Sequence, residues 1–374
     1  MPNLCSKLLF VGYMWPGSTC VPRFNGLVEL GLAVDVFDAT PWSSVQNRLV
    51  NSIGQRAYCT PKVISMNKEI LESARKSRPE VLWIEKGNWI FPSTLKELRR
   101  FSKYIVHYNT DDVFAPANYF WLHRLGIRYY DVFLTTNRWN VLELRSRYGV
   151  KVFRAGMGYD QATHKAFETT NHKRNDLVFI GHWEPHTEMY VQALIKSGAD
   201  VKVWGHNWHK SRNHGFRQIR PLAYSEYVKV VSSAKIALCS LSRKNRNEST
   251  GRSFEIPAIG TMMLAEYTPE HDFIYGDGRG AVLFSNLSEL SERAHYYLDN
   301  STARAEVATA GHMISKEPGY SWAEHIRREW PIVERMLTQP GYTPITAEDV
   351  PFWADFRNGA PPPQAKKGST ATDG

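Results

Sequence analysis

The stretch NESTGRSFEIPAIGTMMLAEYTPE, residues 247–270, runs from a polar loop into a short apolar helix at 254–259 and then, after a glycine, into an apolar strand at 261–265. A helix followed by a glycine and a buried strand is typical of an α/β fold. Two charged side chains stand out, because Glu255 lies at the head of the predicted helix and Arg252 lies one helical turn before it. The fold class follows if the same unit recurs along the chain.

Strands and helices alternate on both sides of this stretch. Apolar runs predict further strands at residues 7–11, 33–37, 80–87, 104–112, 131–137, 150–156, 177–183, 200–205, 235–240 and 281–285. Helical patterns lie at residues 22–32, 92–103, 138–148, 184–197, 224–234, 287–299, 301–315 and 320–338. Such alternation predicts mostly parallel sheets with helices on both faces. We therefore predict an α/β protein built from two Rossmann-like domains that face each other across a cleft.

A polar segment, ETTNHKRND at 168–176, separates the two series of strands. We predict a first Rossmann-like domain at residues 1–165 and a second at 166–340, followed by an extension at 341–358. The last residues, 359–374, are rich in Pro, Gly, Ser and Thr, which predicts a disordered tail. The helix predicted at 320–338 has no packing partner that the pattern alone identifies.

The composition is that of a globular protein. Of 374 residues, 43% are hydrophobic and 13% are aromatic, which is too apolar for a disordered chain. The four cysteines are scattered and form no CxxC pair, so we predict reduced thiols rather than disulfides or zinc ligands. The sequence has no signal-peptide pattern and no run of about 18 apolar residues, which predicts a cytoplasmic protein without a transmembrane segment.

The formal net charge of +9 favours anionic partners such as phosphates, acidic lipid headgroups or nucleic acid. A generally basic soluble surface explains the same charge. No helix-turn-helix or basic repeat is evident, so the charge alone does not indicate a nucleic-acid-binding protein.

Ligands of open α/β sheets bind beyond the carboxyl ends of the strands, so the loops there carry the candidate site residues. After the first strand of the second domain, Gly181 permits close backbone approach, and the helix that follows His182 offers free N–H groups to an anion. The same loop also fits an ordinary strand–helix turn. It contains no GxGxxG and no GK[ST] motif, which disfavours a nicotinamide oxidoreductase and a P-loop NTPase.

The opening stretch carries further candidates for nucleotide binding. The carboxylate of Glu255 can accept hydrogen bonds from both hydroxyls of a ribose, although an acidic residue near a helix start also interacts favourably with the helix dipole. Arg252, together with Arg243, Lys244 and Arg246 close by in the sequence, can neutralise a diphosphate. Arginine suits this role because its guanidinium donates two hydrogen bonds to phosphate oxygens. Ser253, which lies next to Arg252, belongs to the same predicted set.

Aromatic residues that follow strands of the second domain are candidates for a base pocket. Trp204 and Tyr224 lie where a nucleobase would stack. The aromatic content is high throughout the chain, so Trp204 fits a core residue equally well.

In the first domain, the stretch YNTDDVF places Asp111 and Asp112 at a strand end. A carboxylate in a cleft can remove the proton of an acceptor hydroxyl, so both are predicted as catalytic, although one of them could instead cap the following helix. Adjacent strand residues point to opposite sides, so we predict no metal site here. His107, near the same strand end, is predicted either to donate a hydrogen bond to the transferred sugar or to be a buried core residue.

Loops at the strand ends of the first domain also contain candidates for the acceptor side of the cleft. These are Gly12, Tyr13, Trp15, Gly17 and Lys86. The aromatic rings suit stacking on a sugar, and the glycines suit close backbone contact. Trp15 could equally pack over the edge of the domain.

Three motifs of the second half, LVFIGHWEP, GRSFEIPAIGTMMLAEYTPEHDFIY and YSWAEHIRREW, carry a family resemblance. Through them this half resembles the nucleotide-sugar domain of GT-B glycosyltransferases, and most of all the CgeB-type (spore maturation protein-like) group. The first half resembles the matching acceptor domain more loosely, through LLFVGYMWPGST, VLWIEKG, HYNTDD and VFRAGMGYD. Together the motifs span roughly residues 6–338.

The resemblance implies a GT-B architecture, with a nucleotide-sugar donor in the second domain, an acceptor on the first, and Glu255 holding the ribose. Two positions depart from the family pattern. Many retaining members have another glutamate eight positions earlier, where this chain has Asn247 followed by Glu248. Many members also have Arg or Lys in the first loop of the second domain, where this chain has His182 and His186.

We therefore predict a metal-independent glycosyltransferase without a prosthetic group. It would move a sugar from a nucleotide sugar, by default a UDP-sugar, to a hydroxyl of a glycan, protein or small-molecule acceptor. The similarity of FEIPAIG to retaining members favours retention at the anomeric carbon. Two alternatives stay open: a phage-type DNA-modifying glycosyltransferase that acts on a modified base, and a non-catalytic nucleotide-sugar-binding protein.

Overall fold

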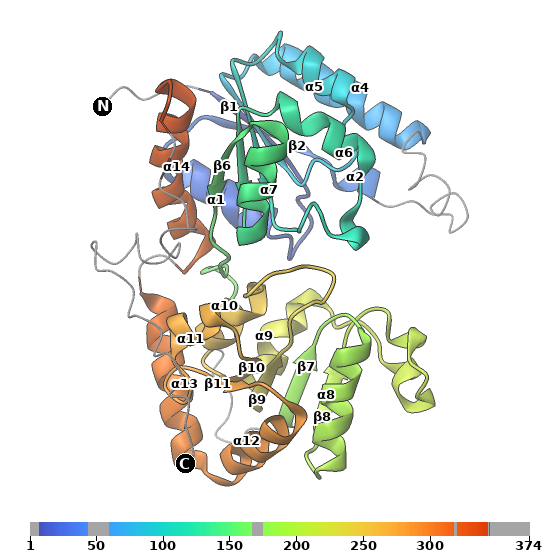
Figure 1. The fold of residues 1–374 in the computed structure, drawn as a ribbon, viewed down its shortest axis with the longest axis vertical. Coiled ribbons are helices and arrows are strands. Elements are labelled where there is room, and N and C mark those ends of the chain that lie inside the picture. Colours follow the sequence, from blue (N-terminus) through green and yellow to red (C-terminus); the bar gives the residue numbers. More distant parts are fainter. Residues whose placement is uncertain (1–6, 44–59, 167–174, 318–319, 343, 345–374) are drawn as a thin grey trace, which may run out of the picture.

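The structure, a computed structural model, describes residues 7–43, 60–166, 175–317, 320–342 and 344. These residues form two α/β domains stacked along the long axis of the molecule (Figure 1). The expected tail at 359–374 and most of the expected extension at 341–358 lie outside the described residues. Cys20 and Cys239 are buried free thiols. No helix in the described part of the chain combines the length and apolarity needed to cross a bilayer.

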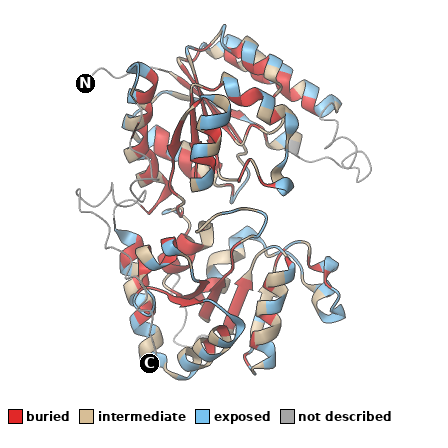
Figure 2. Cartoon of the chain, viewed as in Figure 1, coloured by how far each residue is buried: buried red, intermediate tan, exposed pale blue. Residues whose placement is uncertain are grey.

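Six parallel strands form the first sheet, in the spatial order β2-β1-β3-β4-β5-β6. They are β1 (Leu8–Gly12), β2 (Val34–Asp38), β3 (Val81–Glu85), β4 (Tyr104–Asn109), β5 (Val132–Thr135) and β6 (Lys151–Arg154). Nearly every residue of the four central strands is buried (Figure 2). A parallel sheet that is buried on both faces needs helices on both faces.

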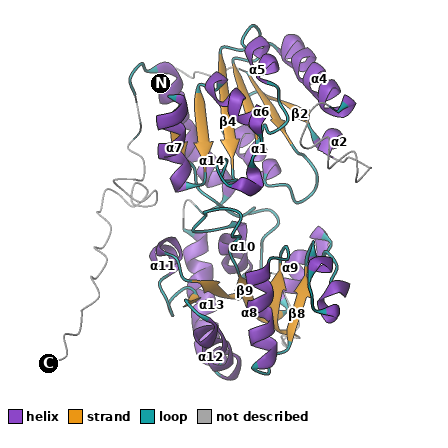
Figure 3. Cartoon of the chain, turned by 45° about the vertical axis from the view of Figure 1, so that its right-hand side comes forward, coloured by secondary structure: helices purple, strands orange, loops and turns teal. Residues whose placement is uncertain are grey.

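Helices supply both covers of the first sheet (Figure 3). α4 (Pro61–Ser77), α5 (Pro92–Leu98) and α7 (Arg138–Tyr148) share one buried cluster with the strands, and α1 (Cys20–Glu29) and α14 (Trp322–Thr338) share the other. Shorter helices complete the domain at α2 (Thr40–Ser43), α6 (Trp121–Gly126), η1 (Pro116–Asn118) and η2 (Ile127–Tyr129). The sequence patterns did not predict α4, although it is among the longest helices described.

The long helix near the end of the chain belongs to the first domain. Trp322, Ile326, Trp330 and Val333 recur at helical spacing and are buried against the first sheet, where Trp330 packs near Trp83. This packing differs from the expected second domain at 166–340, because the apolar side of α14 finds its partner strands in the other half of the chain.

Five parallel strands form the second sheet, in the order β11-β10-β9-β7-β8. They are β7 (Asn175–Ile180), β8 (Val201–Trp204), β9 (Ala234–Cys239), β10 (Met262–Glu266) and β11 (Val282–Phe284). One face packs against α8 (Pro185–Lys196) and α12 (Leu287–Asp299). The other packs against α9 (Tyr224–Ser232), α10 (Gly251–Ile259), α11 (Pro269–Tyr275) and α13 (Ser301–Lys316). Two 3₁₀ turns, η3 (Trp208–Lys210) and η4 (His214–Gln218), follow β8.

In each sheet the direction of strand addition reverses once. β2 and β3 lie on opposite sides of β1, and β8 and β9 lie on opposite sides of β7. The loops that follow these strands diverge and leave a crevice at the carboxyl edge, which is where open α/β sheets bind ligands. The two carboxyl edges meet between the domains, because Asp112 after β4 contacts Arg246 after β9.

Candidate functional site

The first turn of α10 begins the site. The helix starts at Gly251, earlier than the sequence predicted. Thr250 caps it: its side chain accepts a hydrogen bond from the backbone N–H of Ser253, and its own N–H donates to the Ser253 hydroxyl at 3.0 Å. Arg252 and Glu255 therefore both lie inside the helix, three residues apart and on one face.

The guanidinium of Arg252 lies at the reversal point of the second sheet. Its Nη1 donates to the carbonyl of Ile180 at 2.7 Å and its Nη2 to the carbonyl of Ser240 at 2.9 Å. These carbonyls end β7 and β9, and the cation lies 5.4 Å from the ring centre of Phe179. Nε is buried and has no hydrogen-bond partner among the described residues. Since the two acceptors are neutral, they hold the cation in place without cancelling its charge.

Glu255 lies next to Arg252 and is held by a phenol. Its Oε2 accepts a hydrogen bond from the hydroxyl of Tyr227 on α9 at 2.8 Å. Burial, and then the negative charge of Glu255, raise the pKa of Tyr227 well above its ordinary value. The phenol therefore stays protonated as a donor and orients the carboxylate.

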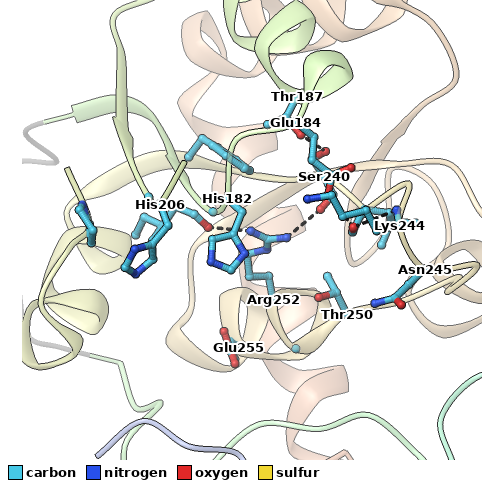
Figure 4. A pocket seen from close by; sticks show the side chains of 18 of the residues that line it. His182, Glu184, Thr187, His206, Ser240, Lys244, Asn245, Thr250, Arg252 and Glu255 are labelled. Carbon is cyan, nitrogen blue, oxygen red and sulfur yellow. Dashed lines mark hydrogen bonds between the residues drawn. The ribbon is translucent and has the colours of Figure 1, made fainter. Parts of the chain in front are cut away.

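Both side chains line a cavity of about 540 Å³ at the carboxyl edge of the second sheet (Figure 4). In Figure 4, Arg252 lies at the centre of the lining, with His182 and His206 to one side and Lys244 and Asn245 to the other. Further polar side chains come from Glu184, Thr187, Ser240, Ser242 and Thr250, and the first domain contributes Asn118. The cavity thus lies in the second domain, with Asn118 of the first domain at its edge.

Two glycines allow the strand ends below the cavity to approach. A Cβ on Gly205 would overlap the carbonyl oxygen of Gly181, and a Cβ on Gly181 would overlap Nη1 of Arg252. Gly205 also has a φ of 154°, which side chains rarely adopt. Gly181 was predicted to admit a ligand, and in the structure its missing side chain also makes room for Arg252.

The charge of the cavity is carried mainly by Arg252 and Lys244. Burial lowers the pKa of His182, and His206, Arg252 and Lys244 lower it further. His182 is therefore neutral at neutral pH and offers a hydrogen bond rather than a charge. The arrangement suits a ligand with an anionic group near Arg252 and hydroxyl donors near Glu255.

Gly181, His182, Arg252 and Glu255, which the sequence predicted to bind a nucleotide, line the cavity. Ser253 does not. It is fully buried, caps α10, and lies 2.7 Å from Nε2 of His271. The sequence placed Ser253 in the site only by its position beside Arg252, and in a helix the next residue points elsewhere.

Trp204, Tyr224 and Arg246 are also absent from the cavity lining. Trp204 packs on the core of the second domain. Tyr224 lies at the start of α9 against the first domain, because a Cβ on Gly17 would approach its ring within 2.6 Å. Arg246 points into the first domain, where it binds two carboxylates.

His107 is part of the first domain's core, which is the second of its two predicted roles and corrects the first, a catalytic hydrogen bond to the transferred sugar. It is fully buried, its Nδ1 lies 3.0 Å from the carbonyl of Ile84, and its Nε2 lies 3.0 Å from Nε2 of His123. Both ring nitrogens are therefore occupied, so neither is free for a sugar.

The two adjacent aspartates differ. Asp112 is fully buried and bound by Arg246 at 2.5 Å and 3.0 Å. Burial acts to raise the pKa of Asp112, but hydrogen bonds from Arg246 and Asn140 outweigh it and hold the pKa below its usual range. A buried carboxylate with a low pKa is a poor base, which corrects its predicted role. Asp111 stays partly exposed, 3.1 Å from Nζ of Lys86.

The other acceptor-side candidates lie in the loops and strand ends of the first domain. Gly12 is buried in the strand end, where a Cβ would come within 2.6 Å of the Phe10 ring. Tyr13 and Trp15 form a ring pair with centres 5.2 Å apart, and Trp15 is 44% exposed. Lys86 has a φ of 58°, a strained backbone for a residue with a side chain and a feature that clusters at functional sites.

Lys244, which the sequence placed near the diphosphate, does line the cavity. Several other lining residues were not predicted, among them Asn118, His206, Tyr227 and Asn245. A signal existed for Tyr227, which lies one helical turn after Tyr224.

In the part of the chain that the structure describes, no three His, Cys, Asp or Glu side chains are grouped so as to hold a metal ion. Metal independence stays a prediction.

Residues 186–329, which include most of the cavity, match the family model described as Glycosyl transferase-like. The chain has no significant sequence match among curated proteins. It is similar to sucrose-phosphate synthase from Thermosynechococcus elongatus, with a TM-score of 0.62 at 10% identity over 88% of this chain and 99% of that one. It is also similar to HepE of Anabaena in complex with UDP-glucose, with a TM-score of 0.59 at 12% identity over 88% and 99% of the two chains.

The fold is that of a GT-B glycosyltransferase. The architecture predicted from the sequence is therefore confirmed, with a glycosyl transferase-like segment in its second domain. The narrower resemblance to the CgeB-type group stays a prediction. A UDP-N-acetylglucosamine 2-epimerase has a similar fold, with a TM-score of 0.51 at 12% identity over 91% of this chain and 98% of that one. The GT-B fold by itself therefore does not separate transfer from epimerisation.

Proposed function

We propose that this protein is a glycosyltransferase that binds a nucleotide sugar in the cavity at α10, with a UDP-sugar as the first donor to test. The observation that carries the proposal is the placement of Arg252 and Glu255 on one face of α10, at the strand reversal of the second sheet. The match of residues 186–329 to a glycosyl transferase-like model supports transfer as the reaction. HepE, which has the same fold, binds UDP-glucose.

The donor would lie with its diphosphate beside Arg252 and Lys244 and its ribose hydroxyls on Glu255. The carboxylate accepts hydrogen bonds, so it suits the diol, and the two cations suit the phosphates. Gly251 and Arg252 lie in the first turn of α10, where backbone N–H groups have no carbonyl acceptor within the helix. Such free N–H groups favour an anion. These positive groups would stabilise the departing diphosphate without a metal ion.

Transfer then needs an acceptor molecule, bound at the first domain, that presents a hydroxyl group. The acceptor oxygen forms a bond to the anomeric carbon, and the bond from that carbon to the diphosphate oxygen breaks with its electron pair. The nucleoside diphosphate leaves, and the acceptor's proton goes to a base. Asp111 is the proposed base, because Asp112 and His107 are committed to the protein interior.

Variants of α10 test the donor assignment. The melting temperature of the wild type should rise with UDP or UDP-glucose, because a ligand bound only by the folded form stabilises it. Glu255→Gln and Arg252→Met should each weaken binding by about tenfold or more and so reduce the rise, since each loses a charge-assisted hydrogen bond to the ligand. Differential scanning fluorimetry, with each variant compared to its own ligand-free form, measures this.

Ser253→Ala is the matched control on the same helix. It should lower the melting temperature, because losing the hydrogen bond from the Thr250 N–H to the Ser253 hydroxyl costs about 1 kcal/mol, but it should keep the rise with ligand. Donor binding at this cavity is refuted if Glu255→Gln and Arg252→Met respond to nucleotide as the wild type does.

Product analysis separates the remaining functions. Transfer releases UDP and links the sugar to the acceptor, and NMR of the new anomeric centre tests the predicted retention. A rearranged sugar still attached to UDP would instead indicate an epimerase. Binding without either product would favour the non-catalytic alternative. Salt-dependent glycosylation of duplex DNA would favour the DNA-modifying one.

A further inference from the structure

The loop between β9 and α10, residues 240–250, contacts both the cavity and the first domain. Its residues Lys244 and Asn245 line the cavity. Its next residues face the other way: Arg246 binds two carboxylates of the first domain, and Asn247 Oδ1 accepts a hydrogen bond from Asn137 at 2.8 Å. One short loop thus carries cavity residues directly beside residues anchored in the other domain.

The anchor in the first domain is Asp112. Its Oδ2 accepts from Nε of Arg246 at 2.5 Å, and its Oδ1 accepts from Nη2 at 3.0 Å, so the pair is bidentate. Asp112 is itself held in place, because its Oδ1 also accepts from Asn140 at 2.7 Å and from the backbone N–H of Phe114 at 3.0 Å. A carboxylate fixed by its own domain is a rigid receptor for the guanidinium.

Backbone and amide contacts extend the anchor to the cavity wall. The backbone N–H of Asp112 donates to Oδ1 of Asn245 at 3.1 Å, and Asn118 donates to the same oxygen at 2.6 Å. Asn118 and Asn245 both line the cavity. Asn118 also donates directly to the carbonyl of Asp112 at 3.1 Å. The cavity residue of the first domain is therefore tied to Asp112 both directly and through the amide of Asn245.

Arg246 has little capacity left for a phosphate, because four of its five N–H groups already donate to carboxylates. Besides Asp112, it binds the carboxylate of Glu143 at 3.1 Å and 2.7 Å. Two carboxylates on one guanidinium more than neutralise its charge. Its role is therefore to fix the loop that carries Lys244.

We propose that Asp112 is a positioning residue: through Arg246 and Asn245 it holds the 240–250 loop so that Lys244 faces the donor, and it couples closure of the two domains to donor binding. This inference rests on the proposed function. It assigns Asp112 no contact with the substrate. Opening the domains would break the pair and expose a buried carboxylate to water, so donor binding and the closed arrangement should stabilise each other.

The test compares Arg246→Met, Asp112→Asn and the double variant with the wild type. Each single variant should weaken UDP affinity at least about tenfold by calorimetry, because without the pair the loop no longer holds Lys244 toward the donor. The double variant should be no weaker than the singles, since the two residues act as one unit. In turnover, the KM for the donor should rise while kcat changes little, which a lost base would not produce.

Arg293→Met is the matched control. Arg293 also binds a carboxylate, donating from Nη1 to both oxygens of Asp277 at 2.6 Å and 2.7 Å, but away from the cavity. It should leave UDP affinity unchanged. Arg246→Lys should bind UDP more tightly than Arg246→Met but less tightly than the wild type. Lysine keeps the positive charge but cannot donate two parallel hydrogen bonds to Asp112.

The inference is overturned if Arg246→Met and Asp112→Asn bind UDP as tightly as the wild type. If the wild type itself binds no nucleotide, the proposed function fails. The part of the inference that concerns domain closure is then tested without a ligand. Small-angle scattering of the ligand-free protein should give a larger radius of gyration for Arg246→Met than for Arg293→Met. Equal radii in that case would overturn the inference as well.

Discussion

At the scale of single residues, Asp111 and Asp112 have the same chemistry and opposite environments. Asp112 is fully buried and paired with Arg246, whereas the side chain of Asp111 keeps 29% of its surface exposed beside Lys86. Both lie in the bend that follows β4, and there only Asp112 turns inward to meet Arg246 and Asn140. The sequence predicted a cleft carboxylate here, and the structure leaves Asp111 as the one that a substrate can reach.

The role proposed for Asp111 predicts a specific kinetic defect. Asp111→Asn should lower kcat by about 10² to 10⁴, because the amide cannot accept the acceptor's proton, while UDP affinity stays unchanged. Steady-state kinetics and calorimetry with UDP measure the two effects. Wild-type turnover in this variant would remove Asp111 from the reaction and leave the departing diphosphate as the group that takes the proton.

At the scale of the element, the loops after β7 and β8 and the first turn of α10 together make the cavity. The Gly181 amide donates to the carbonyl of Trp204 at 2.9 Å, which brings the two strand ends together beneath Arg252. Gly205 lies at their closest point. The cavity floor therefore depends on a backbone contact that tolerates no side chain.

Substitution at that contact should affect both stability and binding. Gly205→Ala should lower the free energy of unfolding by at least about 2 kcal/mol, since the methyl group overlaps a backbone carbonyl that cannot rotate away. It should also weaken UDP binding by displacing Gly181 and Arg252. Urea denaturation and calorimetry measure both, with Gly149→Ala as the control.

Gly149 also has a positive φ, of 63°, but a Cβ there meets nothing within 4 Å. Gly149→Ala therefore measures the stability lost to backbone strain alone, without the steric clash present in Gly205→Ala. If both variants lose the same stability, the close approach at Gly205 is not the cause.

At the scale of the whole molecule, two segments that connect the domains, near Tyr159 and near Tyr320, lie side by side in the described part of the chain. Trp322 N–H donates to the carbonyl of Tyr159 at 3.0 Å, and Tyr159 N–H donates to the carbonyl of Tyr320 at 3.2 Å. Three residues before Tyr159, the N–H of Gly156 donates to Oε1 of Glu329 on α14 at 2.8 Å. A buried carboxyl thus joins the returning helix to the outgoing linker.

This carboxyl predicts a pH dependence of stability. Burial raises the pKa of Glu329 from 4.5 to about 8, although Gly156 N–H, Arg23 and Arg328 act to lower it and Glu85 acts to raise it. Between these values the folded state holds a proton that the unfolded state has lost, so stability falls as the pH rises from about 4.5 to about 8. The change is a few kcal/mol at most.

Glu329→Gln removes this titration and keeps the shape. Its melting temperature relative to the wild type should therefore become more favourable as the pH is raised from about 5 to about 8. Thermal unfolding at several pH values measures the difference. A constant difference across that range would show that Glu329 is already ionised in the folded protein.

Much of the architecture followed from the sequence for physical reasons. Buried parallel strands need unbroken apolar runs, and amphipathic helices need apolar residues at helical spacing, so both leave local patterns. The missed helix α4 had its signals too, because Thr60 caps it, Pro61 starts it, and Val63, Met66 and Ile70 are buried in register. The sequence therefore contains the information needed to predict α4.

The chemistry of the candidate site was also local. Arg252 and Glu255 are three residues apart, so a helix was enough to bring them to one face. The pairing of Asp112 with Arg246 was not local, since 134 residues separate them. Nor was the packing of α14 on the first sheet, or the burial of His107 against His123.

The sequence by itself thus determined the two α/β sheets, the strand ends that could carry a site, and the charged pair on α10. Only the tertiary structure decided which predicted residues reach the cavity and which are held in the interior. The reason is that strands, helices and caps are formed by hydrogen bonds and side-chain spacing among near neighbours. The partner of a buried charge, by contrast, is set by how distant segments pack, and no local pattern encodes that.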